Sequence, residues 1–198
     1  MNNENEWIRL ARAGDQVAFG HLVNAYQKPV YNLTYRMLGN AAEAEEAAQE
    51  AFLRAYKYLQ SYDPNRPFST WLFSIASHYC IDQLRKRRIT WLSFKDEIAT
   101  TDDATTGPTM VHLASYSPNP ESVVAKQERA KHIQQLLDVL SPTDRVAITL
   151  LYWYDYSYEE IAETLDLTVS AVKSRLFRAR RSLAELIEGE REHDPYPM

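Results

Sequence analysis

The sequence predicts an all-α protein in which two small helical domains are joined by a flexible linker. Three observations support this: apolar residues recur at helical spacing, the period-two alternation of strands is nearly absent, and one internal stretch is rich in Asp, Thr, Ser and Pro. With 45% hydrophobic residues among 198, the chain can build two cores. We expect domains at residues 1–88 and 122–188, a linker at 89–121 and a tail at 189–198.

The first recognisable helix is acidic, in the stretch "EAEEAAQEAFLRAYKYL". Its apolar positions form one stripe, which we expect to be buried: Ala44, Ala48, Ala51, Phe52, Ala55 and Leu59. The opposite face carries acids at three- and four-residue spacing together with an outward leucine: Glu43, Glu46, Glu50 and Leu53. Such a face suits a basic helical partner, although an ordinary soluble helix surface would look the same.

A Pro-rich loop then leads into an aromatic and basic helix, "YDPNRPFSTWLFSIASHYCIDQLRKRR". Ser69 or Thr70 is a candidate N-cap. Aromatic residues beside a basic helix can stack single-stranded bases along a phosphate track. Two alternatives remain: Trp71 and Phe73 can be core residues, and the basic run 85–88 can stabilise a helix C-terminus. We expect a core side with Phe68, Leu72, Ile75, Ala76 and Tyr79, and an outer side with Ser74, Ser77, His78, Ile81 and Arg85.

After the linker, capping signals outline a helix-turn-helix. Ser141 precedes Pro142, the preferred order of N-cap and first-turn residue. Ser157 and Glu160 have the spacing of a capping box. The pattern breaks after Leu165, and Thr168 or Ser170 can cap the next helix. Two short helices joined by a turn of about four residues form a helix-turn-helix.

The segment "SAVKSRLFRARRSL", residues 170–183, is the most basic helix face in the sequence. Val172, Leu176, Ala179 and Leu183 fall on one narrow stripe that we expect to be buried. Small residues and arginines lie opposite, as in a helix that enters the DNA major groove. The alternative is a solvated amphipathic helix, but an aromatic residue on the exposed face, Phe177, counts against it. Two roles are open for Phe177: contact with a thymine methyl, or packing against a neighbouring helix. The outward residues are Ser170, Ser174, Phe177, Arg178 and Arg181.

Composition and charge argue against a membrane protein and a secreted protein. No run of about 18 apolar residues predicts a membrane span, and the N-terminus lacks the order of a signal peptide. Cys80 is the only cysteine, so a reducing cytoplasm is expected. The net charge of −5 is unevenly distributed, because acids crowd residues 43–50 and cations crowd 85–88 and 173–181. We expect at least two different partners, and no catalytic residue, cofactor or metal.

Three stretches in this order resemble the extracytoplasmic-function (ECF) sigma factors, the compact sigma subunits of bacterial RNA polymerase. "EAEEAAQEAFLRAY" looks like the family's polymerase-binding motif, and "FSTWLFSIASHYCIDQLRKRR" like its promoter-melting segment. "SYEEIAETLDLTVSAVKSRLFRARRSL" is similar to its upstream-element reader. The likeness implies a sigma region 2 domain at residues 1–88 and a sigma region 4 domain at 122–188. In the turn, Asp166 stands where the family often has Gly, and Asp tolerates the left-handed conformation.

The resemblance implies roles for individual residues. A first set would dock on the coiled coil of the polymerase clamp: Glu46, Gln49, Glu50 and Leu53. A second would hold the melted strand of the downstream (−10) element: Asn65, Arg66, Phe68, Ser74, His78, Arg85 and Arg88. A third would read the upstream (−35) element: Ser170, Lys173, Ser174, Phe177, Arg178 and Arg181. The implied partners are core RNA polymerase, promoter DNA and an anti-sigma factor.

Two other functions compete with this interpretation. A dimeric helix-turn-helix regulator would bind palindromic DNA without polymerase, but it leaves the aromatic-basic stretch unexplained. An enzyme with catalytic carboxylates among residues 43–50 would need a His, Lys or nucleophile beside them, and the sequence offers none there.

Overall fold

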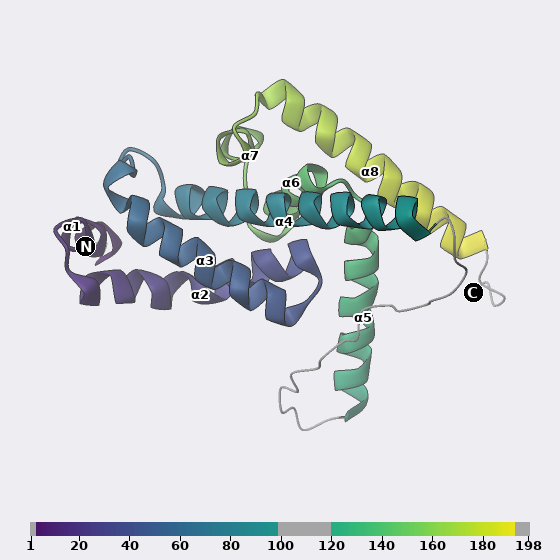
Figure 1. Cartoon of the computed structure of the whole chain (residues 1–198), viewed down its shortest axis with the longest axis horizontal. Helices are drawn as coiled ribbons and strands as arrows, with labels where there is room; N and C mark the ends of the chain where they lie inside the picture. The colour runs from purple at the N-terminus through teal and green to yellow at the C-terminus, as the bar shows by residue number, and fades with distance from the viewer. Residues whose placement is uncertain (1–2, 99–119, 193–198) are drawn as a thin grey trace.

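The computed structural model describes residues 3–98 and 120–192, with side chains for 3–89 and 128–189. All regular elements in these ranges are helices, which confirms the predicted all-α class (Figure 1). They are α1 Asn3–Arg12, α2 Gln16–Leu38, α3 Ala41–Tyr58, the short 3₁₀ helix η1 Leu59–Ser61, α4 Phe68–Ile98, α5 Pro120–Asp138, α6 Pro142–Trp153, α7 Tyr158–Leu165 and α8 Val169–Glu192.

Helices α1 to α4 form what we call the N-terminal bundle. The Asp15 carboxylate caps α2 by accepting hydrogen bonds from the Val17 and Ala18 N–H groups, and Asn40 caps α3 in the same way. Gly39 ends α2 at a φ of 72°, which favours glycine because a side chain is strained there. The apolar stripes of α2, α3 and α4 meet in a core that includes Leu22, Leu33, Met37, Ala51, Ala55 and Leu72.

Helices α5 to α8 form what we call the C-terminal domain. The Ser141 hydroxyl accepts from the Asp144 N–H at 3.3 Å and starts α6, and the capping box of Ser157 and Glu160 starts α7. Asp166 ends α7 in the left-handed region at a φ of 53°. The Thr168 hydroxyl then caps α8 by accepting from the Ala171 N–H. The predicted helix-turn-helix is confirmed, with Thr168 and not Ser170 as the cap.

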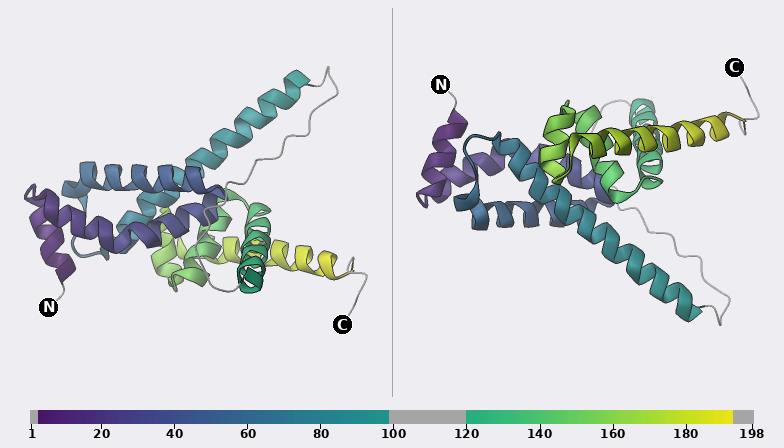
Figure 2. Two further views of the ribbon diagram at one scale, coloured as in Figure 1. Left: turned by 90° about the horizontal axis from the view of Figure 1, so that it is seen from below. Right: turned by 90° about the horizontal axis from the view of Figure 1, so that it is seen from above.

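Several expected boundaries differ from the structure. Helix α4 continues to Ile98, past the end expected at residue 88, and its C-terminal half projects beyond the bundle (Figure 2). Helices α5 and α8 also extend past the expected boundaries, to Pro120 and Glu192. Ser69 and Thr70 are not N-caps, because the Pro67 carbonyl already accepts the Trp71 N–H and α4 begins at Phe68.

One face of α4 is buried that we expected to be exposed. Ser77 and Ile81 are both buried. They lie four and eight residues after Phe73, and therefore on the same side of the helix. Phe73 packs against Tyr154 and Tyr156 of the C-terminal domain, with ring centroids 4.8 and 6.0 Å apart. The second domain thus covers the face that the sequence alone assigned to solvent.

Candidate nucleic-acid interface

Helix α8 presents the predicted DNA-reading face to solvent. Val172, Leu176 and Ala179 are buried against α6 and α7, as the helical spacing predicted. An ion pair of 2.9 Å between Arg175 Nη1 and Asp144 Oδ1 holds α8 to α6. The opposite face of α8 therefore points to solvent. All six residues proposed for upstream DNA are exposed there: Ser170, Lys173, Ser174, Phe177, Arg178 and Arg181.

The exposed α8 face has few competing contacts with the rest of the protein. Phe177 is 68% exposed, so the alternative in which it packs on a neighbouring helix is wrong. The Ser174 hydroxyl donates to the Ser170 carbonyl at 3.0 Å, and Arg181 pairs with Glu185 at 2.8 Å, both within α8. Such contacts between exposed neighbours are weak, and a ligand can replace them.

The sequence analysis missed one pair at the edge of this face. Arg180 Nε donates to the Tyr152 hydroxyl at 3.1 Å, and the guanidinium lies 5.8 Å from the centre of the Tyr152 ring. Hydrogen bonds to Tyr158 and then Tyr152 raise the pKa of Arg180. Arg180 lies seven residues after Lys173 and so shares its side of α8. The pair joins residues 28 positions apart, which no local spacing could reveal.

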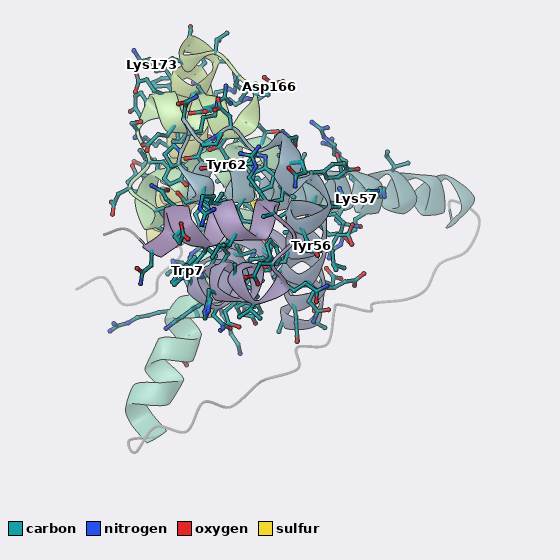
Figure 3. All side chains as sticks on the ribbon, turned by 90° about the vertical axis from the view of Figure 1, so that its left-hand side faces the viewer. Trp7, Tyr56, Lys57, Tyr62, Asp166 and Lys173 are labelled. Carbon is teal, nitrogen blue, oxygen red and sulfur yellow. The ribbon has the colours of Figure 1, made fainter. Side chains whose placement is uncertain are left out.

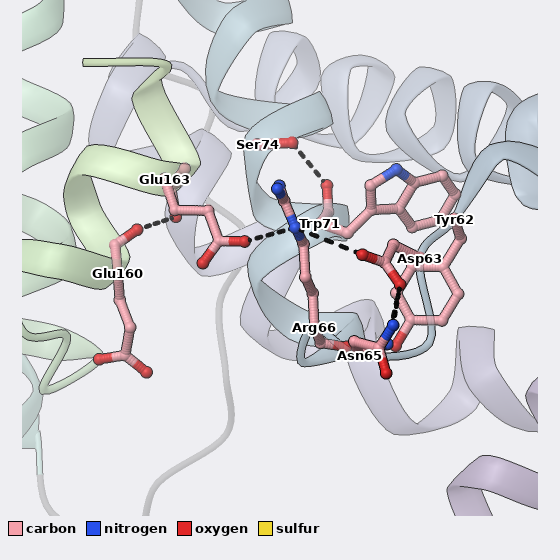
Figure 4. A network of polar contacts seen from close by, with 9 residues as sticks. Tyr62, Asp63, Asn65, Arg66, Trp71, Ser74, Glu160 and Glu163 are labelled. Atoms are coloured by element: carbon pink, nitrogen blue, oxygen red, sulfur yellow. Dashed lines mark hydrogen bonds and ion pairs between the residues drawn. The ribbon is translucent and has the colours of Figure 1, made fainter. Parts of the chain in front are cut away.

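A second candidate surface begins in the loop before α4, shown in Figure 4. The Asp63 carboxylate accepts from both the backbone and the side-chain amide of Asn65, at 3.0 and 2.9 Å. Arg66 lies between two acids: its Nε is 3.8 Å from Asp63 and 2.9 Å from Glu163 of α7. Asn65 and Arg66 are exposed as predicted, but Arg66 already has a partner from the other domain.

Phe68 is the one proposed DNA residue that the structure contradicts. Its side chain is only 2% exposed. It packs among Tyr26, Tyr62 and Trp71, with ring centroids 5.5 to 5.6 Å away. A buried ring in this cluster cannot reach a base, so Phe68 supports the loop from below. The core alternative also holds for Phe73, which is buried, and in part for Trp71, which is half-buried.

Helix α4 continues this surface beyond the loop. Ser74, His78, Arg85 and Arg88 follow one another at helical spacing; Ser74 is half-buried and the others are exposed. The Ser74 hydroxyl donates to the Trp71 carbonyl at 2.8 Å. His78 Nδ1 lies 2.7 Å from the Ser74 carbonyl, which only accepts, so Nδ1 carries the hydrogen and Nε2 remains for a ligand. The result is a polar and cationic track along α4.

The acidic face of α3 lies away from the cationic face of α8 but borders α4, because Glu43 pairs with Arg87 and Glu46 lines the same pocket. Glu46, Gln49 and Leu53 are exposed, and Leu53 is 66% exposed although it is apolar. Glu50 is half-buried and pairs with Arg54 at 2.7 Å. The buried side of α3 consists almost entirely of alanines, so the helix lies close to its neighbours while its outer face stays open. In Figure 3, Tyr56 and Lys57 of α3 lie well away from Lys173 of α8.

The described residues offer no obvious catalytic or metal centre. No group of three or more His, Cys, Asp or Glu side chains is placed to hold a metal within the ranges that carry side chains. Burial raises the pKa of the Cys80 thiol to about 12, which opposes a nucleophilic role. Glu43, at the start of the acidic cluster, is paired with Arg87. In the described part of the chain, no helix is apolar enough over sufficient length to span a membrane.

Two helical domains, one of them a helix-turn-helix whose second helix exposes a cationic face, are typical of DNA-binding proteins, and comparison with known families makes that class specific. Residues 22–90 match the family model of Sigma-70 region 2, and residues 131–183 match that of Sigma-70 region 4. These ranges contain all of the proposed site residues.

Individual relatives lead to the same family. The chain is 41% identical over 177 residues to the ECF RNA polymerase sigma factor SigW of Bacillus subtilis, covering 89% of this chain and 92% of that one. It is 30% identical over 185 residues to the ECF RNA polymerase sigma-E factor of Escherichia coli K12, covering 91% and 92%. The protein belongs to the ECF sigma factors, which decides for a sigma factor over a dimeric regulator.

Solved structures share the fold. CnrH, in complex with the cytosolic domain of CnrY, matches with a TM-score of 0.65 at 23% identity, covering 95% of this chain and 99% of that one. The sigma factor RpoE of Bartonella quintana, in complex with the anti-sigma factor NepR, matches with a TM-score of 0.60 at 23% identity, covering 86% and 96%.

Proposed function

We propose that this sigma factor binds core RNA polymerase through the acidic face of α3 and then presents two DNA-reading surfaces to one promoter. The observation that carries the proposal is the distribution of charge: exposed acids on α3, exposed cations on α8 well away from them, and a further cationic track along α4 and its preceding loop. Opposite charges on separate surfaces suit separate macromolecular partners. The domain roles follow, with melting at residues 1–88 and upstream reading at 122–188.

In this proposal α8 enters the major groove of the upstream element. Arg178 reads a guanine edge, Phe177 contacts a thymine methyl, and Ser174 reaches a base or phosphate. Ser170, Lys173 and Arg181 contact phosphates and set the register. Arg180, oriented by Tyr152, adds a further phosphate contact.

The loop and α4 hold the melted strand of the downstream element. Asn65 and Arg66 contact the strand at the loop, His78 offers Nε2 to a base, and Arg85 and Arg88 follow the backbone. Capturing an unstacked base offsets the cost of local melting, about a few kcal/mol per base. Phe68 has no direct DNA role here and keeps the loop in place.

The assignment of the α3 face is tested by reversing its charge. Glu50→Lys places a cation beside Arg54 on a face proposed to meet a basic partner, and we expect co-purification with core polymerase to be lost. Glu6→Lys is the matched control, because Glu6 also pairs with an arginine of its own helix, Arg9. Glu6→Lys should leave association intact. Equal retention of polymerase by both variants would remove the role of α3.

We further propose that the protein acts in the cytoplasm, catalyses no reaction itself, and is controlled by an anti-sigma factor. The support is family membership, together with the relatives CnrH and RpoE, whose structures contain CnrY and NepR. Copurification of a tagged chain from its own cells, with and without polymerase, would identify the anti-sigma factor.

A further inference from the structure

The middle of helix α6 is buried on all sides, which a small helix-turn-helix domain by itself does not require. Residues 144–150 are buried without interruption, including the polar residues Arg145 and Thr149. One side of α6 packs on α7 and α8, and the other lies against α2 and α4 of the N-terminal bundle. Helices that are covered all round belong to a larger core. The outer side of α6 is therefore built for a partner.

Arg145 inserts from α6 into the C-terminal end of α2. It is 5% exposed; its Nη1 donates to the Met37 carbonyl at 2.7 Å and pairs with Asp138 at 2.9 Å. The last carbonyls of a helix lack partners within the helix and carry its negative dipole end. Gln134 of α5 contacts the preceding carbonyl, that of Arg36, at 3.3 Å. The C-terminal domain thus caps a helix of the N-terminal bundle.

Aromatic residues at the end of α6 and just after it make the second contact with the N-terminal bundle. The Tyr154 hydroxyl donates to the Pro29 carbonyl of α2 at 2.6 Å, and its ring meets the edge of Phe73. The guanidinium of Arg36 lies over the Trp153 ring at 4.7 Å. These contacts are specific in geometry, since each joins a defined donor or ring to one partner.

The interface is nevertheless not built like a permanent core. Ser77 Oγ, Thr149 Oγ1 and Arg145 Nε are buried without a hydrogen-bond partner. Burial of unsatisfied polar groups opposes association, because these groups are hydrogen-bonded to water when the surfaces separate. Such an interface can open at moderate cost, which suits reversible docking.

The third contact reaches the proposed DNA surface. Glu163 of α7 pairs with Arg66 at 2.9 Å, in the loop proposed to hold the melted strand (Figure 4). A carboxylate on this arginine takes the place that a phosphate would occupy. Glu163 occupies the Nε side of the guanidinium and places a negative charge beside any phosphate that binds there, so α7 and the strand compete for Arg66.

We propose that the face formed by Arg145, Thr149, Tyr154 and Glu163 is an interaction surface whose partner in the free chain is the chain's own N-terminal bundle. While it is docked, α7 holds Arg66, and single-stranded DNA at the loop displaces it. Docking and DNA binding then oppose each other reciprocally. The competition for Arg66 rests on the proposed function, whereas the docked state does not.

The docked state is tested by an interdomain distance in the full chain. Spin labels at Asn24→Cys on α2 and Ser182→Cys on α8 occupy exposed positions, and buried Cys80 stays unlabelled. We expect one narrow distance distribution, independent of protein concentration. Adding Tyr154→Phe, Glu163→Gln and Arg145→Met together should broaden it. A broad distribution in the parent, or a narrow one that depends on concentration, overturns the proposal.

The competition is tested with a fluorescent single-stranded oligonucleotide pool of random sequence at low salt. Glu163→Gln should bind about two- to fivefold tighter, the range expected for loss of a partly exposed ion pair. Glu159→Gln is the control, with the same charge change on the same helix and an exposed side chain. In an Arg66→Ala background the gain should vanish. Equal affinity of Glu163→Gln and Glu159→Gln overturns the competition.

Failure of the proposed function would look different. If the chain neither binds core polymerase nor opens a promoter with it, the function fails, yet the distance measurement still decides the docked state. If polymerase is bound and the parent distance is broad, the function stands and the docking proposal falls.

Discussion

The two surfaces proposed to read DNA differ in how far they depend on tertiary contacts. On α8, all six proposed residues are exposed and their hydrogen bonds stay within the helix. In the loop before α4, Arg66 is held by the other domain and Phe68 belongs to the core. A helix presents its outer face by its own periodicity, whereas a loop takes its shape from the residues packed around it. One surface is therefore preformed, and the other depends on tertiary contacts.

The largest test of this difference compares two phenylalanines. Phe68→Ala removes a fully packed ring and should lower the free energy of unfolding by about 3–5 kcal/mol, whereas Phe177→Ala should change it by less than about 0.5 kcal/mol. Chemical denaturation measures both. Phe177→Ala should still weaken upstream promoter binding by the holoenzyme. If Phe177→Ala destabilised the fold as strongly as Phe68→Ala, the α8 face would be structural.

An intermediate effect, on DNA binding, is expected from Arg178 on the exposed face of α8. Arg178→Ala should cost about 1–3 kcal/mol of upstream binding and relax specificity at one promoter position, because a base-reading arginine is lost. Binding of holoenzyme to a panel of single-base promoter variants measures this. Arg66→Ala should weaken binding of the downstream single strand by less than this amount, because the wild-type arginine must first leave Glu163. Uniform weakening on every sequence would make Arg178 a phosphate contact.

The smallest effect should come from the pair at the edge of α8. Tyr152→Phe keeps the ring but removes the hydroxyl that accepts from Arg180, and should weaken upstream DNA binding by about 0.5–1.5 kcal/mol, equally on all sequences. Tyr58→Phe is the control, since Tyr58 is an exposed tyrosine with a cation, Lys57, over its ring. A sequence-dependent loss in Tyr152→Phe would instead indicate that Arg180 reads a base.

Local signals in the sequence predicted the starts of α6, α7 and α8 and the turn between α7 and α8. The caps at Ser141, Ser157 and Thr168 and the left-handed turn at Asp166 depend on residues within a few positions of each other. The buried stripes of α3 and α8 depend only on helical spacing. These features need no knowledge of the rest of the chain, which is why the helix-turn-helix and its outward face could be derived.

Contacts between distant residues could not be derived in this way. Ser77 and Ile81 were assigned to solvent because helical spacing does not tell which of two faces a second domain will cover. Helical spacing placed Phe68 on the core side of its helix, and the structure confirms this; the DNA role came only from the family resemblance and does not fit the packing of Phe68 among Tyr26, Tyr62 and Trp71. The boundary at residue 88 was wrong because a basic run can continue a helix as well as end it.

The sequence by itself determined that this chain is helical, where α6, α7 and α8 are capped, and which face of α8 carries the cations, since these follow from short-range hydrogen bonding and periodicity. Only the tertiary structure decided that Arg145 caps α2, that Tyr154 meets Pro29 and that Glu163 holds Arg66. Each of these pairs spans about a hundred residues, and such pairs form only when two separately folded domains dock.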